Sequence, residues 1–148
     1  MTKKKIVIIG AGVSGLLCGK RLAEAGHSAL ILDKGRNTGG RMSTRQTDGA
    51  VFHHGACSLP DFYSHKKLPE FGLEIFKSAE KDKIIQREGN QFEPINSVAD
   101  FVNYFGNNLN IRESCEAISL NLNNKTICVQ HRGSVHEKTP YDLLILSI

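Results

Sequence analysis

The sequence has no tryptophan, four prolines and little excess charge, and these shortages exclude several classes of protein. Its 148 residues carry 19 Lys and Arg against 15 Asp and Glu, which leaves a net charge of +4 that is partly terminal. We therefore predict no nucleic-acid partner, because nucleic-acid binding uses a basic stripe interleaved with aromatic residues. No stretch reaches the roughly 20 apolar residues that a membrane span requires, so no membrane span is expected.

The cysteines are few and irregularly spaced. They are Cys18, Cys57, Cys115 and Cys128. Neither a C-x-x-C pair nor a metal-like spacing occurs, so we expect no disulfide framework, and a reducing cytoplasm is the expected compartment. No metal site is expected at His53-His54, since adjacent histidines point in different directions and no third ligand is apparent.

The composition is that of one soluble globular domain, which we expect to span residues 1–148. A short β-branched run, Ile6–Ile9, predicts a strand buried on both faces. Residues 14–25 predict a helix that ends at Gly26, and Ala29–Leu32 predicts a second strand. Together these segments form a βαβ unit.

The remaining segments predict a mixture of helices and antiparallel strands. We expect a long functional loop at 34–58, helices at 69–81 and from Ser97, a hairpin or small meander that includes 118–129 with a second turn near Gly133-Ser134, and a buried strand at 143–148. Ile118, Leu120 and Leu122 are expected on one face of the hairpin, and Phe101 and Phe105 in a core. The chain is expected to stop inside its last strand.

The motif Gly10-Ala11-Gly12-Val13-Ser14-Gly15 is a G-x-G-x-x-G that follows a strand and opens a helix, the context in which it binds dinucleotides. Gly10 permits a tight turn, Gly12 lets the backbone approach a pyrophosphate, and Gly15 lets helix and strand pack closely. Phosphates are expected at the helix N-terminus, where unpaired N–H groups favour an anion. Ser14 is predicted to bind phosphate rather than to act as a nucleophile, because no G-x-S-x-G elbow surrounds it.

Asp33 ends the second strand, where a carboxylate can accept hydrogen bonds from ribose hydroxyls and repel a 2′-phosphate. The βαβ unit alone leaves NAD(P) and FAD open, since both present an ADP moiety. Gly39-Gly40-Arg41 follows, and its guanidinium has a planar fork that can hold pyrophosphate oxygens. A solvated basic loop is an equal interpretation of that tripeptide alone.

The segment Ile31–Arg45, followed by Phe52-His53-His54-Gly55-Ala56, resembles the FAD-binding N-terminus of renalase-like flavoproteins, within the flavin amine oxidase and protoporphyrinogen oxidase superfamily. The resemblance continues through Pro94–Ser97, Glu116–Leu120 and Tyr141–Leu146. It implies an α/β FAD/NAD(P)-binding Rossmann-like domain, whose parallel sheet has helices on one face and a small antiparallel β-meander on the other.

The resemblance also implies a set of cofactor-binding residues and leaves the catalytic residues unknown. The pyrophosphate would contact the glycine motif and Arg41, Asp33 would hold the ribose, the isoalloxazine would lie near Gly55, Ala56 and Cys57, and Ala117 would touch adenine through its backbone. The full set is Gly10, Gly12, Val13, Ser14, Gly15, Asp33, Lys34, Gly40, Arg41, Met42, Gly55, Ala56, Cys57 and Ala117. Cys57 stands where the family usually has Gln, and His53 where it usually has Asp.

Three hypotheses about function follow. The first is a flavoenzyme that oxidises an amine or a dihydronicotinamide-type substrate by two electrons, completed by further chain or a partner, because family members carry an additional substrate domain and a C-terminal FAD segment. In this first hypothesis FAD is the cofactor and NAD(P)H a candidate substrate. The second is a nicotinamide-dependent Rossmann dehydrogenase domain. The third is a non-catalytic remnant. Small-molecule cofactor and substrate are the expected partners, with a homodimer formed through an exposed strand edge as a further expectation.

Overall fold

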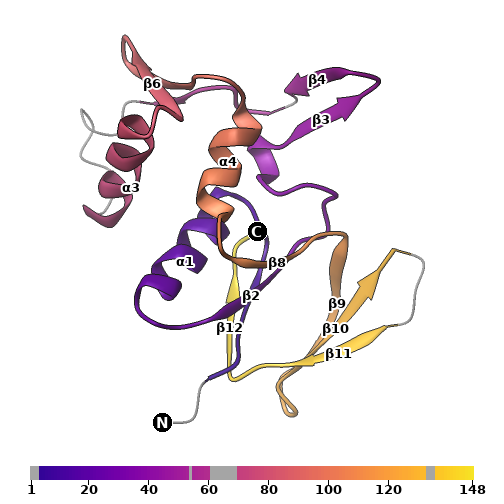
Figure 1. Ribbon diagram of the computed structural model, residues 1–148. Coiled ribbons are helices and arrows are strands. Elements are labelled where there is room, and N and C mark those ends of the chain that lie inside the picture. Colours follow the sequence, from indigo (N-terminus) through magenta and orange to yellow (C-terminus); the bar gives the residue numbers. More distant parts are fainter. Residues whose placement is uncertain (1–3, 54, 61–69, 133–135) are drawn as a thin grey trace. The chain divides into compact units, whose positions relative to one another are not determined.

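The structure is a computed structural model that describes residues 4–53, 55–60, 70–132 and 136–148 (Figure 1). The chain divides into two compact units: residues 1–40 with 106–148, and residues 41–105. His54 and the turn predicted near Gly133-Ser134 lie outside the described residues.

The first unit is built on a parallel sheet of four strands in the order β12-β1-β2-β8. These are β1 (Ile6–Ile9), β2 (Ala29–Leu32), β8 (Asn110–Arg112) and β12 (Leu143–Leu146). Helix α1 (Val13–Glu24) joins β1 to β2. The predicted βαβ unit is therefore confirmed, with the helix shifted by one residue.

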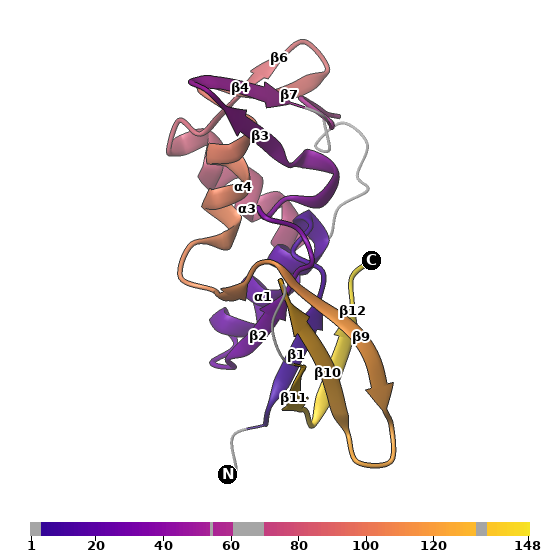
Figure 2. The ribbon, with the colours of Figure 1, turned by 90° about the vertical axis from the view of Figure 1, so that its right-hand side faces the viewer.

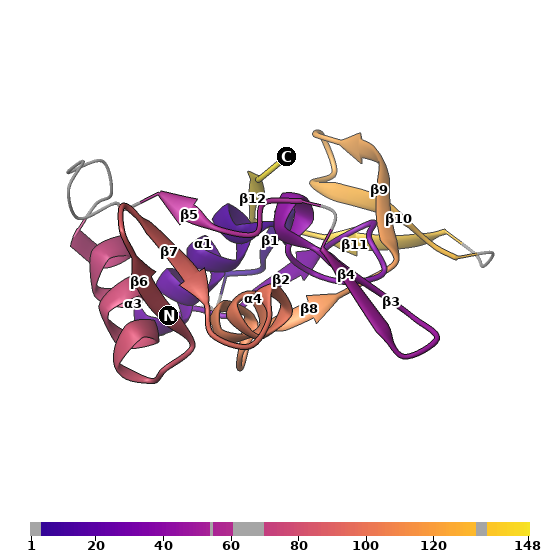
Figure 3. The ribbon, with the colours of Figure 1, turned by 90° about the horizontal axis from the view of Figure 1, so that it is seen from above.

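Helix α1 and an antiparallel meander cover opposite faces of this sheet (Figure 3). On the helix face, α1 approaches β2 so closely that a Cβ on Gly19 would lie 2.8 Å from the Ile31 side chain. On the other face, Val7 and Leu32 form a buried cluster with Ile127 and Val129 of the meander. Side chains of β1 and β2 therefore pack on both faces of the sheet, against α1 on one face and against the meander on the other. Both strands are continuous apolar runs for that reason.

The meander consists of β9 (Cys115–Asn121), β10 (Thr126–His131) and β11 (Glu137–Pro140), paired in the order β11-β10-β9 (Figure 2). This confirms the predicted α/β fold class with its small antiparallel sheet. Its apolar side chains are not all buried: Ile118 and Leu120 are 42% and 43% exposed. A register shift between Cys128 and Val129 changes the pairing within the strand.

The prediction of a fully buried last strand was wrong. Strand β12 pairs with β1 along one side only, because it lies at the edge of the sheet. Leu143 and Leu146 are consequently 44% and 56% exposed. An apolar run of four residues does not distinguish an edge strand from a central one.

The second unit combines two helices, a 3₁₀ turn and two antiparallel sheets. Its elements are η1 (Gly40–Met42), β3 (Thr44–Thr47), β4 (Ala50–His53), β5 (Leu59–Pro60), α3 (Glu70–Lys81), β6 (Ile85–Glu88), β7 (Gln91–Pro94) and α4 (Val98–Gly106). None of the described helices is long and apolar enough to cross a membrane.

The two predicted helices of this unit are confirmed, and aromatic side chains form its core. Phe76 of α3 and Phe101 and Phe105 of α4 are buried, with the last two rings in edge-to-face contact at 4.5 Å. The Ser97 hydroxyl accepts a hydrogen bond from the Asp100 N–H at 3.1 Å, as the predicted cap requires.

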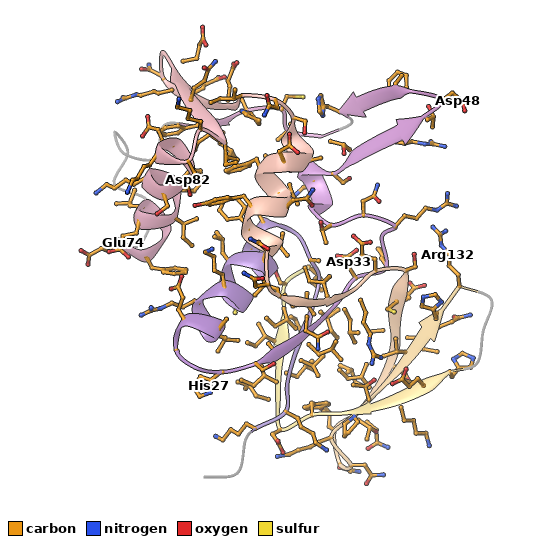
Figure 4. The ribbon with its side chains drawn as sticks, viewed as in Figure 1. His27, Asp33, Asp48, Glu74, Asp82 and Arg132 are labelled. Carbon is orange, nitrogen blue, oxygen red and sulfur yellow. The ribbon has the colours of Figure 1, made fainter. Side chains whose placement is uncertain are left out.

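The segment 34–58, predicted as one long loop, contains the β3–β4 hairpin. Asp48 lies at its tip (Figure 4), and Asp48 and Gly49 both have positive φ, 45° and 81°. An Asp-Gly pair favours the two-residue hairpin turn, so the sequence did carry a signal for it. The flanking strands have four residues each and β3 is entirely polar, which hid the hairpin.

Candidate functional site

The glycine motif lies where the sequence places it, between the end of β1 and the start of α1. Gly10 has a φ of +105°, and a Cβ there would lie 2.0 Å from the Ser147 carbonyl oxygen. A Cβ on Gly15 would lie 2.0 Å from the Gly10 carbonyl oxygen. Both positions therefore require glycine to close the loop against its own backbone and against the end of β12.

Gly12 differs from Gly10 and Gly15, because a side chain at Gly12 would have room. Its φ of −69° and ψ of 171° suit any residue, and a Cβ there would meet no atom of the described residues within 4 Å. The local structure of the chain therefore does not demand glycine here. A ligand that approaches the backbone closely would demand it, as a pyrophosphate does in dinucleotide-binding loops.

The N-terminus of α1 follows Gly12, and its first N–H groups have no acceptor within the helix. The first hydrogen bond of the helix runs from the Leu16 N–H to the Gly12 oxygen at 3.0 Å, and in the part of the chain that the structure describes no side chain caps the helix. The N–H groups of Val13, Ser14 and Gly15 precede that bond and have no helical acceptor. Ser14 is also exposed. Such an end attracts an anion through its donors and the helix dipole.

Asp33 follows β2 directly and is half-buried (Figure 4). Its Oδ2 accepts a hydrogen bond from the Ala11 N–H at 2.5 Å, and its Oδ1 accepts one from the Gly35 N–H at 2.6 Å. The carboxylate is thus held beside the glycine motif. An ionised carboxylate has about four acceptor sites, so capacity for ribose hydroxyls remains.

The segment after Asp33 turns back onto the glycine motif. The Gly39 N–H donates to the Ala11 oxygen at 2.8 Å, and Gly39 pairs with Gly12 in an isolated parallel bridge. Gly40 has a φ of +55°, and a Cβ there would lie 3.2 Å from the Gly12 Cα. The structure therefore brings Gly40 close to the backbone of Gly12. Lys34, another predicted binding residue, is exposed in the same segment.

The predicted flavin-side residues belong to the second unit and gather around Arg41. The Arg41 oxygen accepts a hydrogen bond from the Ala56 N–H at 2.8 Å, and a Cβ on Gly55 would lie 1.8 Å from that oxygen. Cys57 is exposed, with its Sγ 3.6 Å from the Gly55 oxygen. Arg41 is exposed, whereas Met42 is buried. Within the second unit, a hydrogen bond thus brings Arg41 together with the segment 55–57, which is distant from it in the sequence.

Ala117, the predicted adenine contact, lies in β9 opposite Val129 and packs partly against the core of the first unit. The one shifted pKa in the described residues belongs to Tyr104, which is outside the predicted set. Burial, together with the hydrogen bond to Asp82 at 2.9 Å, raises the pKa of this hydroxyl above 10.0.

Two residues near the site were missed by the sequence analysis. Ser147 N–H donates to the Ile9 oxygen at 2.8 Å, and the Ser147 Oγ would lie 3.3 Å from a Cβ on Gly15. Glu113 accepts a hydrogen bond from the Thr38 N–H at 2.8 Å. Each follows a strand of the parallel sheet, and that position was the available signal, since ligands bind outside the carboxyl ends of such strands.

Comparison with known proteins supports a nucleotide-binding fold. Residues 8–71 match the family model described as "NAD(P)-binding Rossmann-like domain". A segment of 61 residues, 40% of the chain, is 44% identical to 4,4'-diapophytoene desaturase (4,4'-diaponeurosporene-forming) from Staphylococcus aureus, strains MRSA252 and Newman among others. That segment spans 12% of the length of those relatives.

Solved structures share the fold across nearly the whole chain. The PF1083 protein from Pyrococcus furiosus has a TM-score of 0.64 and 17% identity over 97% of this chain and 59% of its own. An oxidoreductase from Methanosarcina mazei has a TM-score of 0.62 and 15% identity over 96% of this chain and 58% of its own. The chain therefore carries a Rossmann-like nucleotide-binding fold, and its glycine motif supports a dinucleotide cofactor.

Proposed function

We propose that the chain binds FAD through the ADP moiety and serves a flavin-dependent oxidoreductase. The observation that carries this proposal is the open space before Gly12, beside the uncapped N-terminus of α1. A backbone without a Cβ at the point of approach and a helix N-terminus without a side-chain cap suit a pyrophosphate, and the adjacent Asp33 carboxylate suits the ribose.

The choice of FAD over a nicotinamide dinucleotide rests on the segment after β2. Gly39 pairs with Gly12 and Gly40 lies close to the Gly12 backbone, and the residue that follows, Arg41, is exposed. The resemblance to renalase-like flavoproteins assigns this stretch to the pyrophosphate of FAD, with Gly55, Ala56 and Cys57 toward the flavin ring. The link between Arg41 and Ala56 supports that assignment, because one hydrogen bond couples the two segments.

Flavin, when bound, supplies a two-electron acceptor for a hydride from the substrate. The chain would contribute binding, orientation and exclusion of water. Substrates of the renalase and amine oxidase type, an amine or a dihydronicotinamide, follow from the resemblance. The similarity to 4,4'-diapophytoene desaturases agrees with an oxidoreductase and leaves the substrate class wider. We place no residue of this chain in the chemical step.

An NAD(P)-binding dehydrogenase domain is the second candidate. The match of residues 8–71 to a family described as NAD(P)-binding favours it. Asp33 would then select NAD over NADP, since its carboxylate repels a 2′-phosphate.

A titration of the purified chain with FAD and with NAD separates these candidates. FAD is followed by its visible absorption before and after gel filtration, and NAD by calorimetry. We expect flavin absorption to co-elute with the protein. Binding of NAD without FAD would replace the first candidate by the second, and binding of neither would favour the non-catalytic hypothesis.

A further inference from the structure

The Asp33 carboxylate uses both of its oxygens on the backbone of neighbouring loops. Oδ2 lies 2.5 Å from the Ala11 nitrogen and Oδ1 lies 2.6 Å from the Gly35 nitrogen. Hydrogen bonds to an ionised acceptor are shorter and stronger than neutral ones. Asp33 therefore connects the glycine motif to the segment that follows β2.

The backbone N–H and the carbonyl oxygen of Ala11 both form hydrogen bonds with the segment 33–39. Its N–H donates to Asp33, and its carbonyl oxygen accepts from the Gly39 N–H at 2.8 Å. The side chain of Ala11 is fully buried. Movement of the glycine motif away from residues 33–39 would therefore break two hydrogen bonds at once.

Glycine-rich loops need such a restraint, because glycine has wide conformational freedom. The N–H groups expected to meet the pyrophosphate belong to the first turn of α1, which begins two residues after Ala11, at Val13. Without the bond to Asp33, the peptide that precedes these donors would lose its fixed acceptor. An ordered loop binds an anion more tightly than one that must be ordered on binding.

We propose that Asp33 is a positioning residue, which fixes the pyrophosphate-binding N–H groups by holding the Ala11 amide, and that this contribution to affinity is independent of the ribose hydroxyls. The inference rests on the proposed binding of an ADP moiety and deepens it. It differs from the role expected from the sequence, in which Asp33 acts through the ribose alone.

Calorimetry with ADP and 2′,3′-dideoxy-ADP tests the proposal on the full chain and on Asp33→Asn. We expect the substitution to weaken dideoxy-ADP about tenfold and ADP by at least that factor, because it removes a charge-assisted hydrogen bond from the loop. Loss of affinity for ADP, with dideoxy-ADP binding unchanged, would overturn the proposal and return Asp33 to a ribose contact.

Asp142→Asn is the matched control. Asp142 also accepts a backbone N–H, that of Lys5 at 2.7 Å, but it lies before β12 and so at the opposite edge of the parallel sheet. We expect this variant to bind both nucleotides as the natural chain does. Equal weakening by the two variants would show a general loss of structure and contradict a specific role for Asp33.

Amide hydrogen exchange, measured without ligand, tests the restraint separately from the proposed function. In Asp33→Asn we expect the Ala11 amide to exchange about tenfold faster, while the amide of Ile8 in β1 is unchanged. Unchanged exchange at Ala11 would overturn the proposal. If the natural chain binds neither nucleotide, the proposed function fails, and the exchange result alone decides whether Asp33 restrains the loop.

Discussion

Both edges of the parallel sheet, where the strands end and where they begin, carry hydrogen bonds beyond the strands, but the two edges differ in their use of glycine. At the carboxyl edge, the residues after β12, β1 and β2 (Ser147, Gly10 and Asp33) each donate a backbone N–H to the last residue of the neighbouring strand, at 2.8, 2.8 and 3.0 Å. At the amino edge, the Asp142 N–H donates to the Lys5 oxygen at 2.8 Å, and the Asp142 Oδ2 accepts the Lys5 N–H at 2.7 Å.

The carboxyl edge alone combines crowded glycines with an open one. Gly10 and Gly15 have no room for a Cβ, whereas Gly12 has room and nothing of the described chain to fill it. Hydrogen bonding therefore does not mark the site. The steric pattern marks it instead: two glycines are required by the fold, and the third leaves the space that we propose a ligand occupies.

The largest effect is expected from Gly15→Ala. The new Cβ would overlap the Gly10 oxygen, a backbone atom that cannot turn aside. We expect a loss of about 3 kcal/mol in the free energy of unfolding, at the upper end for overpacking. Urea denaturation measures it. A variant as stable as the natural chain would show that the close approach of helix and strand is not required.

Gly12→Ala is expected to lower FAD affinity while leaving the stability of the fold nearly unchanged. The backbone angles suit alanine and the space is open, so stability should change by no more than about 0.5 kcal/mol. FAD affinity should fall at least about tenfold, or 1.4 kcal/mol, since a methyl group would occupy the approach to the pyrophosphate. Fluorescence titration measures it. Unchanged affinity would place the ligand elsewhere.

Gly26→Ala tests a glycine at the amino edge. Gly26 ends α1 with a φ of +79°, and no atom of the described residues lies within 4 Å of a Cβ there. The cost should be that of left-handed backbone alone, about 1 kcal/mol in thermal or urea unfolding. FAD affinity should stay the same. A fall in affinity would contradict the claim that, of the two edges, only the carboxyl edge has a glycine that affects ligand binding.

The smallest effect is expected from Asp142→Asn. It weakens one exposed hydrogen bond to the Lys5 N–H, so the free energy of unfolding should fall by about 0.5 kcal/mol. A loss of several kcal/mol in urea denaturation would mean that the amino edge is held more tightly than its exposure suggests.

The sequence predicted the first unit well, because its signals are local. Ile6–Ile9, the glycine motif and Asp33 occur in one short stretch, and each has a steric or hydrogen-bonding reason for its place. The meander followed from alternation and turn residues. What the sequence did not contain was the pairing of Asp33 with the Ala11 amide, since any backbone N–H in reach can serve a carboxylate.

The second unit was harder to predict because its strands have four residues or fewer and show no regular apolar pattern. In β6, Ile85 is the one buried residue, and Phe52 of β4 is 56% exposed. Neither hairpin shows the alternation that indicates a half-buried strand. Their two-residue turns, Asp48-Gly49 and Gly89-Asn90, were the readable signals.

One measurement tests the central claim directly: paired FAD titrations and urea unfolding curves of the natural chain, Gly12→Ala and Gly15→Ala. We expect the natural chain to bind FAD, Gly12→Ala to keep its stability and lose at least about tenfold in affinity, and Gly15→Ala to lose stability. A stable Gly12→Ala variant that binds FAD as tightly as the natural chain would contradict the assignment of the glycine motif as the dinucleotide site.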